Sequence, residues 1–208
     1  MKRHKVRFSE QIASLGSYLI NNVSSQYGTK KLANILEFKS QVTLEKYLGY
    51  LTEAYLIFPL IRHSTKAGAR LRSSKKMYVV DNGFVTAKAV QHSPNMGKLM
   101  ENLVFTELVK KGNQPGRELF YYKTRNDREV DFVLKKWYQV IELIQVCYDT
   151  TDPEIEQREV KALIEAGKEL NVSTLTALTW NEKRTVEKDN MTIQFRPLWD
   201  WLLEKTEA

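Results

Sequence analysis

The stretch REVDFVLKKWYQVIELIQVCYD, residues 128–149, constrains the fold of this chain more than any other. It contains two apolar, β-branched runs separated by a short polar break, which is typical of two strands joined by a turn. Asp131 stands in the first run, and Glu142, Gln145 and Cys147 stand in the second. The pattern therefore predicts a β-hairpin that carries acidic and amide side chains.

The segments around this hairpin predict a sheet with helices on its faces. Helical spacing of apolar residues favours helices before and after the hairpin, and Gly112 and Pro153 are typical of a helix end and a helix start. The expected order is helix 96–112, strands 118–124, 129–136 and 138–148, helix 153–170, strands 174–180 and 192–195, and a closing helix at 197–205. This order fits a mixed sheet flanked by helices.

The residues before this region predict a second, smaller unit. Apolar residues at helical spacing indicate helices over 8–25 and 29–38 and a third that starts at Ser40 or Thr43. Two strand candidates follow, 55–62 and 75–81, joined by a polar connection that contains Gly68 and three serines. Three helices followed by strand, loop and strand is the order of a winged helix. We therefore expect an α/β (α+β mixed) chain with domains at 1–92 and 93–208.

Charge is distributed unevenly between these two units. Residues 1–95 contain 15 Lys and Arg residues against 5 Asp and Glu residues, whereas residues 96–208 contain 17 against 20. The expected wing has no acidic residue, and a basic wing supplies salt-dependent contacts to phosphates. We expect double-stranded DNA as the partner, with the third helix, which carries Lys46, toward the major groove. The expected contact residues on the wing are Arg62, Lys66, Arg70, Arg72, Lys75 and Lys76.

Several segments in the right order carry a resemblance to a known family. They are TLEKYLGYLTEAYLI, KMYVVDNGF, MENLVFTEL, FYYKTRNDREVDFVL and LIQVCYD. Together they resemble the C-terminal region of a family of prokaryotic AAA+ ATPases, in which a winged helix precedes a PD-(D/E)XK nuclease-like domain. The resemblance implies a restriction-endonuclease-like second domain and an AAA+ ATPase partner, or an ATPase half outside this sequence. The chain itself has no phosphate-binding G-x-x-x-x-G-K-[ST] motif, so we expect no ATP binding by that route.

The resemblance also assigns site residues. Glu101 matches the helix glutamate of the nuclease-like domain and Asp131 matches its strand aspartate, which makes them the expected ligands of Mg²⁺ or Mn²⁺ if the site is active. The family signature of a carboxylate, one residue and a lysine reads Gln145, Val146 and Cys147 here. An amide is a weaker metal ligand than a carboxylate, and a thiol does not replace the lysine that stabilises phosphate charge. We therefore expect an incomplete catalytic set with no required cofactor.

Neighbouring residues offer three ways to restore the site. Glu129 shares the face of Asp131, Lys123 is a candidate cation, and a β-bulge would be needed to turn Glu142 toward Gln145, because residues three apart in a strand face opposite sides. Structural roles are the alternative. Glu101 would then complement its helix start, Asp131 would bond within the sheet or pair with a basic neighbour, and Gln145 would satisfy nearby backbone.

Three hypotheses about function follow. The first is DNA binding without efficient cleavage, the second is a Mg²⁺-dependent endonuclease, and the third is a protein-docking module for an ATPase or another partner. No apolar run approaches the roughly 20 residues of a membrane span, and we expect no membrane partner. A single cysteine, Cys147, favours the cytoplasm.

Overall fold

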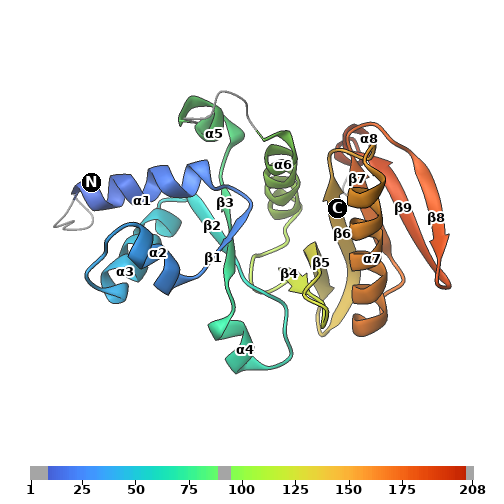
Figure 1. The fold of residues 1–208 in the computed structure, drawn as a ribbon, viewed down its shortest axis with the longest axis horizontal. Helices are drawn as coiled ribbons and strands as arrows, with labels where there is room; N and C mark the ends of the chain where they lie inside the picture. Colours follow the sequence, from blue (N-terminus) through green and yellow to red (C-terminus); the bar gives the residue numbers. More distant parts are fainter. Residues whose placement is uncertain (1–8, 89–94, 205–208) are drawn as a thin grey trace.

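The structure of this protein is a computed structural model that describes residues 9–88 and 95–204 (Figure 1). Residues 9–88 form helices and a small antiparallel sheet. In chain order the elements are α1 (Ser9–Asn21), β1 (Ser25–Tyr27), α2 (Thr29–Ile35), α3 (Gln41–Glu53), β2 (Ile57–Leu60), α4 (Ala67–Arg72), β3 (Lys75–Val79) and α5 (Asn82–Lys88). The expected domain boundary at 92/93 lies outside the described residues.

The apolar residues of the three predicted helices meet in one core. Leu15 and Leu19 of α1, Leu32 of α2, and Leu44 and Leu48 of α3 are buried together. Their spacing of three or four residues places them on one side of each helix, which is why each helix buries a single face. The core is closed by the sheet, whose strand order is β1-β3-β2, with β3 antiparallel to both neighbours.

Two elements of this half differ from the expectation. The connection between β2 and β3 was expected to be a loop, but it contains the short helix α4. Its sequence, AGARLR, is rich in Ala, Leu and Arg, which favour helix, and the hydroxyl of Ser73 donates to the carbonyl of Ala69 at 2.6 Å. Strand β1 was not expected because only three residues form it. The winged-helix assignment stays a prediction.

Residues 95–204 form a six-stranded mixed sheet with helices on both faces, as predicted. The strand order is β4-β5-β6-β7-β9-β8, with parallel pairing only for β6–β7 and β7–β9 among the described strands. The elements are α6 (Met96–Lys110), β4 (Leu119–Lys123), β5 (Glu129–Lys136), β6 (Gln139–Cys147), α7 (Pro153–Leu170), β7 (Leu175–Thr179), β8 (Arg184–Lys188), β9 (Met191–Pro197) and α8 (Leu198–Leu202). Strand β8 was missed because its sequence, RTVEK, has mostly charged and polar residues on an outer strand.

The two faces of this sheet are covered by different helices. Helices α6 and α8 pack on one face, through residues such as Phe105 and Trp201. Helix α7 packs on the other face, through Val160, Leu163 and Ile164 (Figure 1). Within the described ranges, no helix has both the length and the apolar character needed to cross a bilayer.

The small sheet of the first half packs directly on α6 of the second half. The ring of Tyr78 in β3 stacks on Phe105 in α6, with ring centroids 4.1 Å apart. The amide of Asn102, which is fully buried, accepts from the N–H of Val79 at 2.9 Å and donates to its carbonyl at 3.1 Å. An α6 side chain therefore satisfies both backbone groups of a β3 residue, much as a neighbouring strand would.

A second link joins the two sheets at their edges. The N–H of His63 donates to the carbonyl of Tyr121 in β4 at 2.7 Å, and the N–H of Tyr121 donates to the carbonyl of Ile61 at 3.2 Å. The base of the expected wing is thus fixed to β4. The two halves share buried apolar residues as well as backbone hydrogen bonds.

Because Phe105 is buried among residues from both halves, Phe105→Ala should destabilise the whole chain. We expect a loss of about 3–5 kcal/mol in the free energy of unfolding, the usual cost of emptying such a site. Urea unfolding followed by tryptophan fluorescence and by far-UV circular dichroism should give coincident transitions. Val42→Ala, at a residue that is 74% exposed, is the control and should change stability little. Separate transitions for the two probes would contradict the shared core.

Candidate functional site

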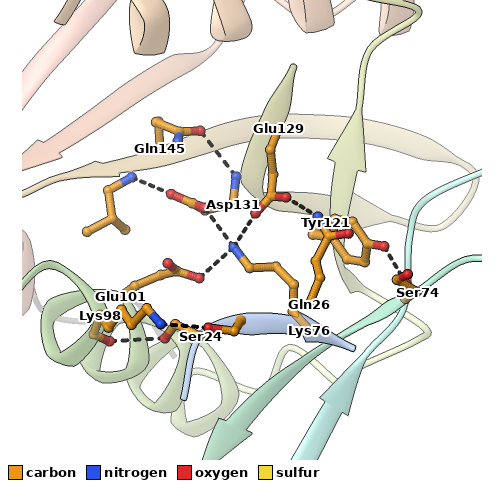
Figure 2. Close-up of polar contacts among 12 residues, drawn as sticks. Ser24, Gln26, Ser74, Lys76, Lys98, Glu101, Tyr121, Glu129, Asp131 and Gln145 are labelled. Atoms are coloured by element: carbon orange, nitrogen blue, oxygen red, sulfur yellow. Dashed lines mark hydrogen bonds and ion pairs between the residues drawn. The ribbon is translucent and has the colours of Figure 1, made fainter. Parts of the chain in front are cut away.

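One lysine ammonium lies among three carboxylates where the two halves meet. Nζ of Lys76 is 2.6 Å from Oε1 of Glu101, 2.7 Å from Oε1 of Glu129 and 2.8 Å from Oδ1 of Asp131 (Figure 2). The side chain of Lys76 is 2% exposed, and those of Asp131 and Glu101 are 8% and 13% exposed. We call these four residues the Lys76 cluster.

Three elements supply the side chains of the cluster. Lys76 is in β3, the central strand of the small sheet, where it pairs with Gln26 of β1 and Leu60 of β2. Glu101 comes from α6, and Glu129 and Asp131 lie two residues apart in β5, so both point to the same side of that strand. The first half thus supplies the cation and the second half supplies the carboxylates.

Hydrogen bonds fix the carboxylates further. The hydroxyl of Tyr78 donates to Oε1 of Glu101 at 2.6 Å, and the side-chain amide of Gln26 donates to Oε2 of Glu129. The second oxygen of Asp131, Oδ2, accepts from the N–H of Val146 at 3.0 Å. Each carboxylate therefore has a neutral partner in addition to the ammonium.

Asp131 and Gln145 also shape the end of the hairpin. The pairing of β5 with β6 ends at Phe132 and Ile144, while β6 continues along β7 as far as Cys147. Beyond that point, Oε1 of Gln145 accepts from the N–H of Asp131 at 3.2 Å. Two side chains take over the backbone bonds that a continued strand pair would have made. The structural role expected for Gln145 is therefore present.

A further carboxylate lies behind Gln145. This carboxylate belongs to Glu159 in α7. The side-chain amide nitrogen of Gln145 donates to its Oε2 at 2.6 Å, and Arg158 forms an ion pair with its Oε1 at 2.6 Å. Burial raises the pKa of Glu159 above its usual value, against the hydrogen bond from Arg158. A charged ligand at position 145 is replaced here by an amide that bridges the backbone and α7.

Burial and charge act against each other in the Lys76 cluster. Burial alone would lower the pKa of Lys76, but Asp131, Glu101 and Glu129 raise it well above its usual value, so the ammonium stays charged. Burial, together with the charge of Asp131, raises the pKa of Glu101 to about 8 although Lys76 opposes this change. Glu101 therefore holds a proton at neutral pH more readily than an exposed glutamate does.

A cavity of about 500 Å³ adjoins the cluster. Its walls come from the β4–β5 turn, the ends of β5 and β6, and one side of α7. The residues lining it include Glu101, Arg128, Glu129, Asp131, Gln145, Arg158 and Glu159. The cavity thus has a carboxylate-rich wall with two arginines beside it.

The donor set does not fit the divalent metal that a nuclease-like fold implies. Gln145 is neutral, and its oxygen and nitrogen already bond to Asp131 and Glu159. The position on which the carboxylates converge is taken by Nζ of Lys76. In the described part of the chain, no three His, Cys, Asp or Glu residues are arranged to hold a metal ion. We therefore derive no catalytic step through a metal.

The expected substitutes do not reach the site. The carboxylate of Glu142 accepts from the hydroxyl of Thr176 at 2.7 Å. A bulge does occur in β6, but it falls between Val140 and Glu142, and the strand is regular from Glu142 to Ile144. Lys123 pairs with Asp127 at 3.0 Å and makes no ion pair with Asp131 among the described residues. Of the three substitutes, Glu129 alone joins the cluster.

Cys147 is a small buried residue in this site, as predicted. It is 3% exposed, and burial together with nearby acidic residues raises the pKa of its thiol to about 12. A thiol with such a pKa stays protonated at neutral pH, so it supplies neither a nucleophile nor a metal ligand.

The basic residues expected on the wing divide into two groups. Lys76 is buried in the cluster, which corrects its expected place on the exposed wing: β3 is covered on both sides, so its alternate residues do not reach solvent. Arg62 is half-buried and donates through Nη2 to the carbonyl of Lys123 at 2.7 Å. Lys66 and Arg72 are exposed, Arg70 and Lys75 are partly exposed, and Lys46 is exposed on α3.

Sequence reasoning missed three residues that shape this site. They are Lys76 as a cluster member, Gln26 and Glu159. Lys76 lies 55 residues before Asp131, so its contact depends on how the two halves pack. A partial signal was available, because the KKMYV strand places a lysine within an otherwise apolar run.

Comparisons with known proteins identify matches but no activity. Residues 1–94 match a domain of unknown function (DUF8612), and residues 96–198 match another domain of unknown function (DUF4143). The chain is 37% identical to the uncharacterized protein MJ1544 of Methanocaldococcus jannaschii, over 98% of this chain and 46% of that protein. It is 24% identical to an uncharacterized protein of Haemophilus influenzae, over 71% of this chain and 36% of that protein. The chain thus spans less than half the length of these relatives.

Among solved structures, a complex of Thermococcus gammatolerans McrB AAA+ hexamers with bound McrC is similar over 88% of this chain and 46% of that chain. The sequence identity is 13% and the TM-score is 0.37. A similarity at this level carries no argument about function.

Removing the ammonium should strongly destabilise the protein. Lys76→Met leaves Glu101, Glu129 and Asp131 without their counter-charge, and breaking a buried ion pair in this way costs about 3–5 kcal/mol. Urea unfolding of Lys76→Met and of the neighbouring control Lys75→Met measures the difference. Equal stability of the two variants would contradict the central role of Lys76.

The pKa of Glu101 also predicts a pH dependence. Because its pKa is about 8 in the folded protein and near the usual 4.5 in the unfolded chain, folding favours the protonated form. The contribution of Glu101 to the free energy of unfolding is fully present below pH 4.5 and is lost as the pH rises toward about 8. Between these values, the free energy of unfolding of the wild type should fall by about 1–3 kcal/mol relative to Glu101→Gln. Parallel pH profiles of the two proteins would contradict this assignment.

Proposed function

We propose that this chain binds double-stranded DNA through a basic surface formed by Lys66, Arg70, Arg72 and Lys75, and that its nuclease-like half does not cleave the DNA. The basic surface is the observation that carries the proposal. Arg70 and Arg72 lie in the last turn of α4, which projects from the lower edge of the molecule in Figure 1. No acidic residue occurs between Arg62 and Lys76 in the sequence.

The positive charge of this surface is not neutralised within the protein. Across residues 9–88 and 95–204, none of these four side chains forms an ion pair. Several basic residues of the second half do, for example Arg128 with Glu165 and Lys168 with Asp189. The four cations lie in α4, at its N-cap and at the start of β3, and such a cluster suits contacts to backbone phosphates. The surface contacts backbone phosphates, so the binding we propose has little dependence on sequence.

Helix α3 adds less to this proposal than expected. Its exposed residues include Val42, Glu45 and Lys46, so its outer face carries both charges. Lys46 lies over the ring of Tyr50, 5.8 Å from its centroid. We therefore place the main phosphate contacts on α4 and the strand that follows it, with Lys46 as an additional contact.

The absence of cleavage in this proposal follows from the chemistry of the second half. A nuclease of this kind requires charged metal ligands and a cation free to contact the phosphate. Gln145 is neutral, and the cation at the site is enclosed by carboxylates. The alternative is a Mg²⁺-dependent endonuclease, which a cleavage assay with and without a divalent metal distinguishes from DNA binding alone.

A docking role is a second candidate. Trp137 and Tyr138, at the β5–β6 turn, are 85% and 95% exposed, and exposed aromatic residues are typical of protein contacts. The curated relatives are more than twice as long as the matched region, which leaves room for an ATPase module in them. Under this second proposal, the chain is the C-terminal part of an AAA+ ATPase or docks on one.

DNA affinity should depend steeply on salt and on α4. In Arg70→Ala/Arg72→Ala, binding to labelled duplexes of unrelated sequence should weaken about equally, and the slope of log affinity against log salt should fall by about 2. Lys136→Ala/Lys188→Ala removes the same charge from the second half and should leave binding nearly unchanged. Fluorescence anisotropy at several salt concentrations measures both variants.

The same samples with Mn²⁺ or EDTA test cleavage. We expect no metal-dependent products; products that disappear in Asp131→Asn would make the protein an endonuclease. No binding at low salt would reject the DNA proposal and leave the docking module.

A further inference from the structure

We propose that Lys76 is a built-in counter-ion that takes the place of a divalent metal in the nuclease-like site and excludes metal from it. This inference does not depend on DNA binding. It rests on the geometry of the Lys76 cluster, on the balance of charge within it and on the strand that holds the lysine. Each of these three points is independent of the basic surface on α4.

The geometry is that of a cation site with its cation supplied by the protein. One carboxylate oxygen from each of Glu101, Glu129 and Asp131 lies 2.6–2.8 Å from a single atom, Nζ of Lys76. Nζ donates a hydrogen bond to Oδ1 of Asp131 and forms ion pairs with Glu101 and Glu129. Metal–oxygen distances are shorter, about 2.3–2.6 Å for Ca²⁺ and about 2.0–2.1 Å for Mg²⁺, so the oxygens would have to move inward to hold a metal, and no such set is arranged to do so among the described residues.

The charges explain why the ammonium and a metal exclude each other. Three carboxylates attract a cation, but Nζ already occupies the point on which they converge. A divalent ion at that point would lie against a second cation in a largely buried cluster, where repulsion is less screened than in water. Removing the ammonium leaves an excess of negative charge beside a cavity through which an ion can enter.

The ammonium cannot readily leave the cluster. Lys76 is in the central strand of the small sheet, hydrogen-bonded between β1 and β2, and its side chain is 2% exposed. The adjacent residues Tyr78 and Val79 are fixed to α6 by the ring stack and by Asn102. Withdrawal of Nζ would require β3 to separate from α6.

Lys76 also differs from a lysine that assists phosphate chemistry. Such a lysine needs an N–H group directed at the substrate. Here Nζ donates to Oδ1 of Asp131 at 2.8 Å and also forms ion pairs with Glu101 and Glu129, so its charge is already balanced by carboxylates of the protein. Lys76 therefore neutralises the carboxylates of the site and does not act as a catalytic lysine.

The test is metal binding in the absence of DNA. Isothermal titration of the full chain with Mn²⁺ and with Ca²⁺ compares the wild type, Lys76→Ala and Lys76→Ala/Asp131→Asn. We expect Lys76→Ala to bind at least about tenfold more tightly than the wild type, a difference of about 1.4 kcal/mol. The added Asp131→Asn change should abolish that gain. Lys136→Ala, at an exposed lysine of β5, is the control and should bind metal as the wild type does.

A stability measurement gives a second readout. Metal that binds the folded state should raise the melting temperature of Lys76→Ala and leave that of the wild type unchanged. Lys76→Gln, which keeps most of the side-chain length without the charge, replaces Lys76→Ala if the latter does not fold. The proposal is overturned if the wild type binds as tightly as the variant, or if a folded variant gains no metal affinity. Wild-type binding that is lost in Asp131→Asn would overturn it without any lysine variant.

Discussion

The ammonium of Lys76 and the carboxylates of Glu101, Glu129 and Asp131 hold much of the structure in place. Asp131 and Glu101 are buried and Glu129 is partly exposed, and their convergence would be unfavourable without a cation. Lys76 supplies that cation from the other half of the chain, so the packing of β3 on α6 and the neutralisation of the site depend on each other. The neighbouring stack of Tyr78 on Phe105 and the Asn102 bonds to Val79 fix the same strand. The Lys76 cluster and the Tyr78–Phe105 stack thus stabilise the same interface between β3 and α6.

This interface changes how the nuclease-like half is understood. In our proposal, its mixed sheet, with Asp131 in β5 and Glu101 in α6, is the scaffold of a nuclease-like domain. The residue at position 145 is neutral, however, and it bonds to the backbone of β5 and to Glu159. Together with Lys76, it ties Asp131 and Glu159 into a network of internal bonds. The role we propose for the chain is therefore binding, with the basic residues of α4 as the contact surface.

The sequence predicted the regular elements well and the contacts between them poorly. Strand β5 and helix α7 lie where the apolar periodicity and Pro153 placed them, because local patterns reflect which face of an element is buried. Helix α4 was missed because Gly68 and three serines outweighed the helix-forming Ala, Leu and Arg residues. Asp131 and Glu101 were predicted as site residues, and they do lie in one cluster. Lys76 was placed on the wing because its neighbours in sequence are basic, and local pattern contains no information on the packing of β3 against α6.

The central claim is that Lys76 stays charged and enclosed by the three carboxylates in the folded protein. Proton–nitrogen correlation NMR of the lysine ammonium groups observes this directly, since an exposed ammonium exchanges its protons with water too fast to be detected near neutral pH. We predict one slowly exchanging ammonium signal that disappears in Lys76→Met and does not shift when Mg²⁺ is added. Absence of that signal, or its displacement by Mg²⁺, would contradict the account.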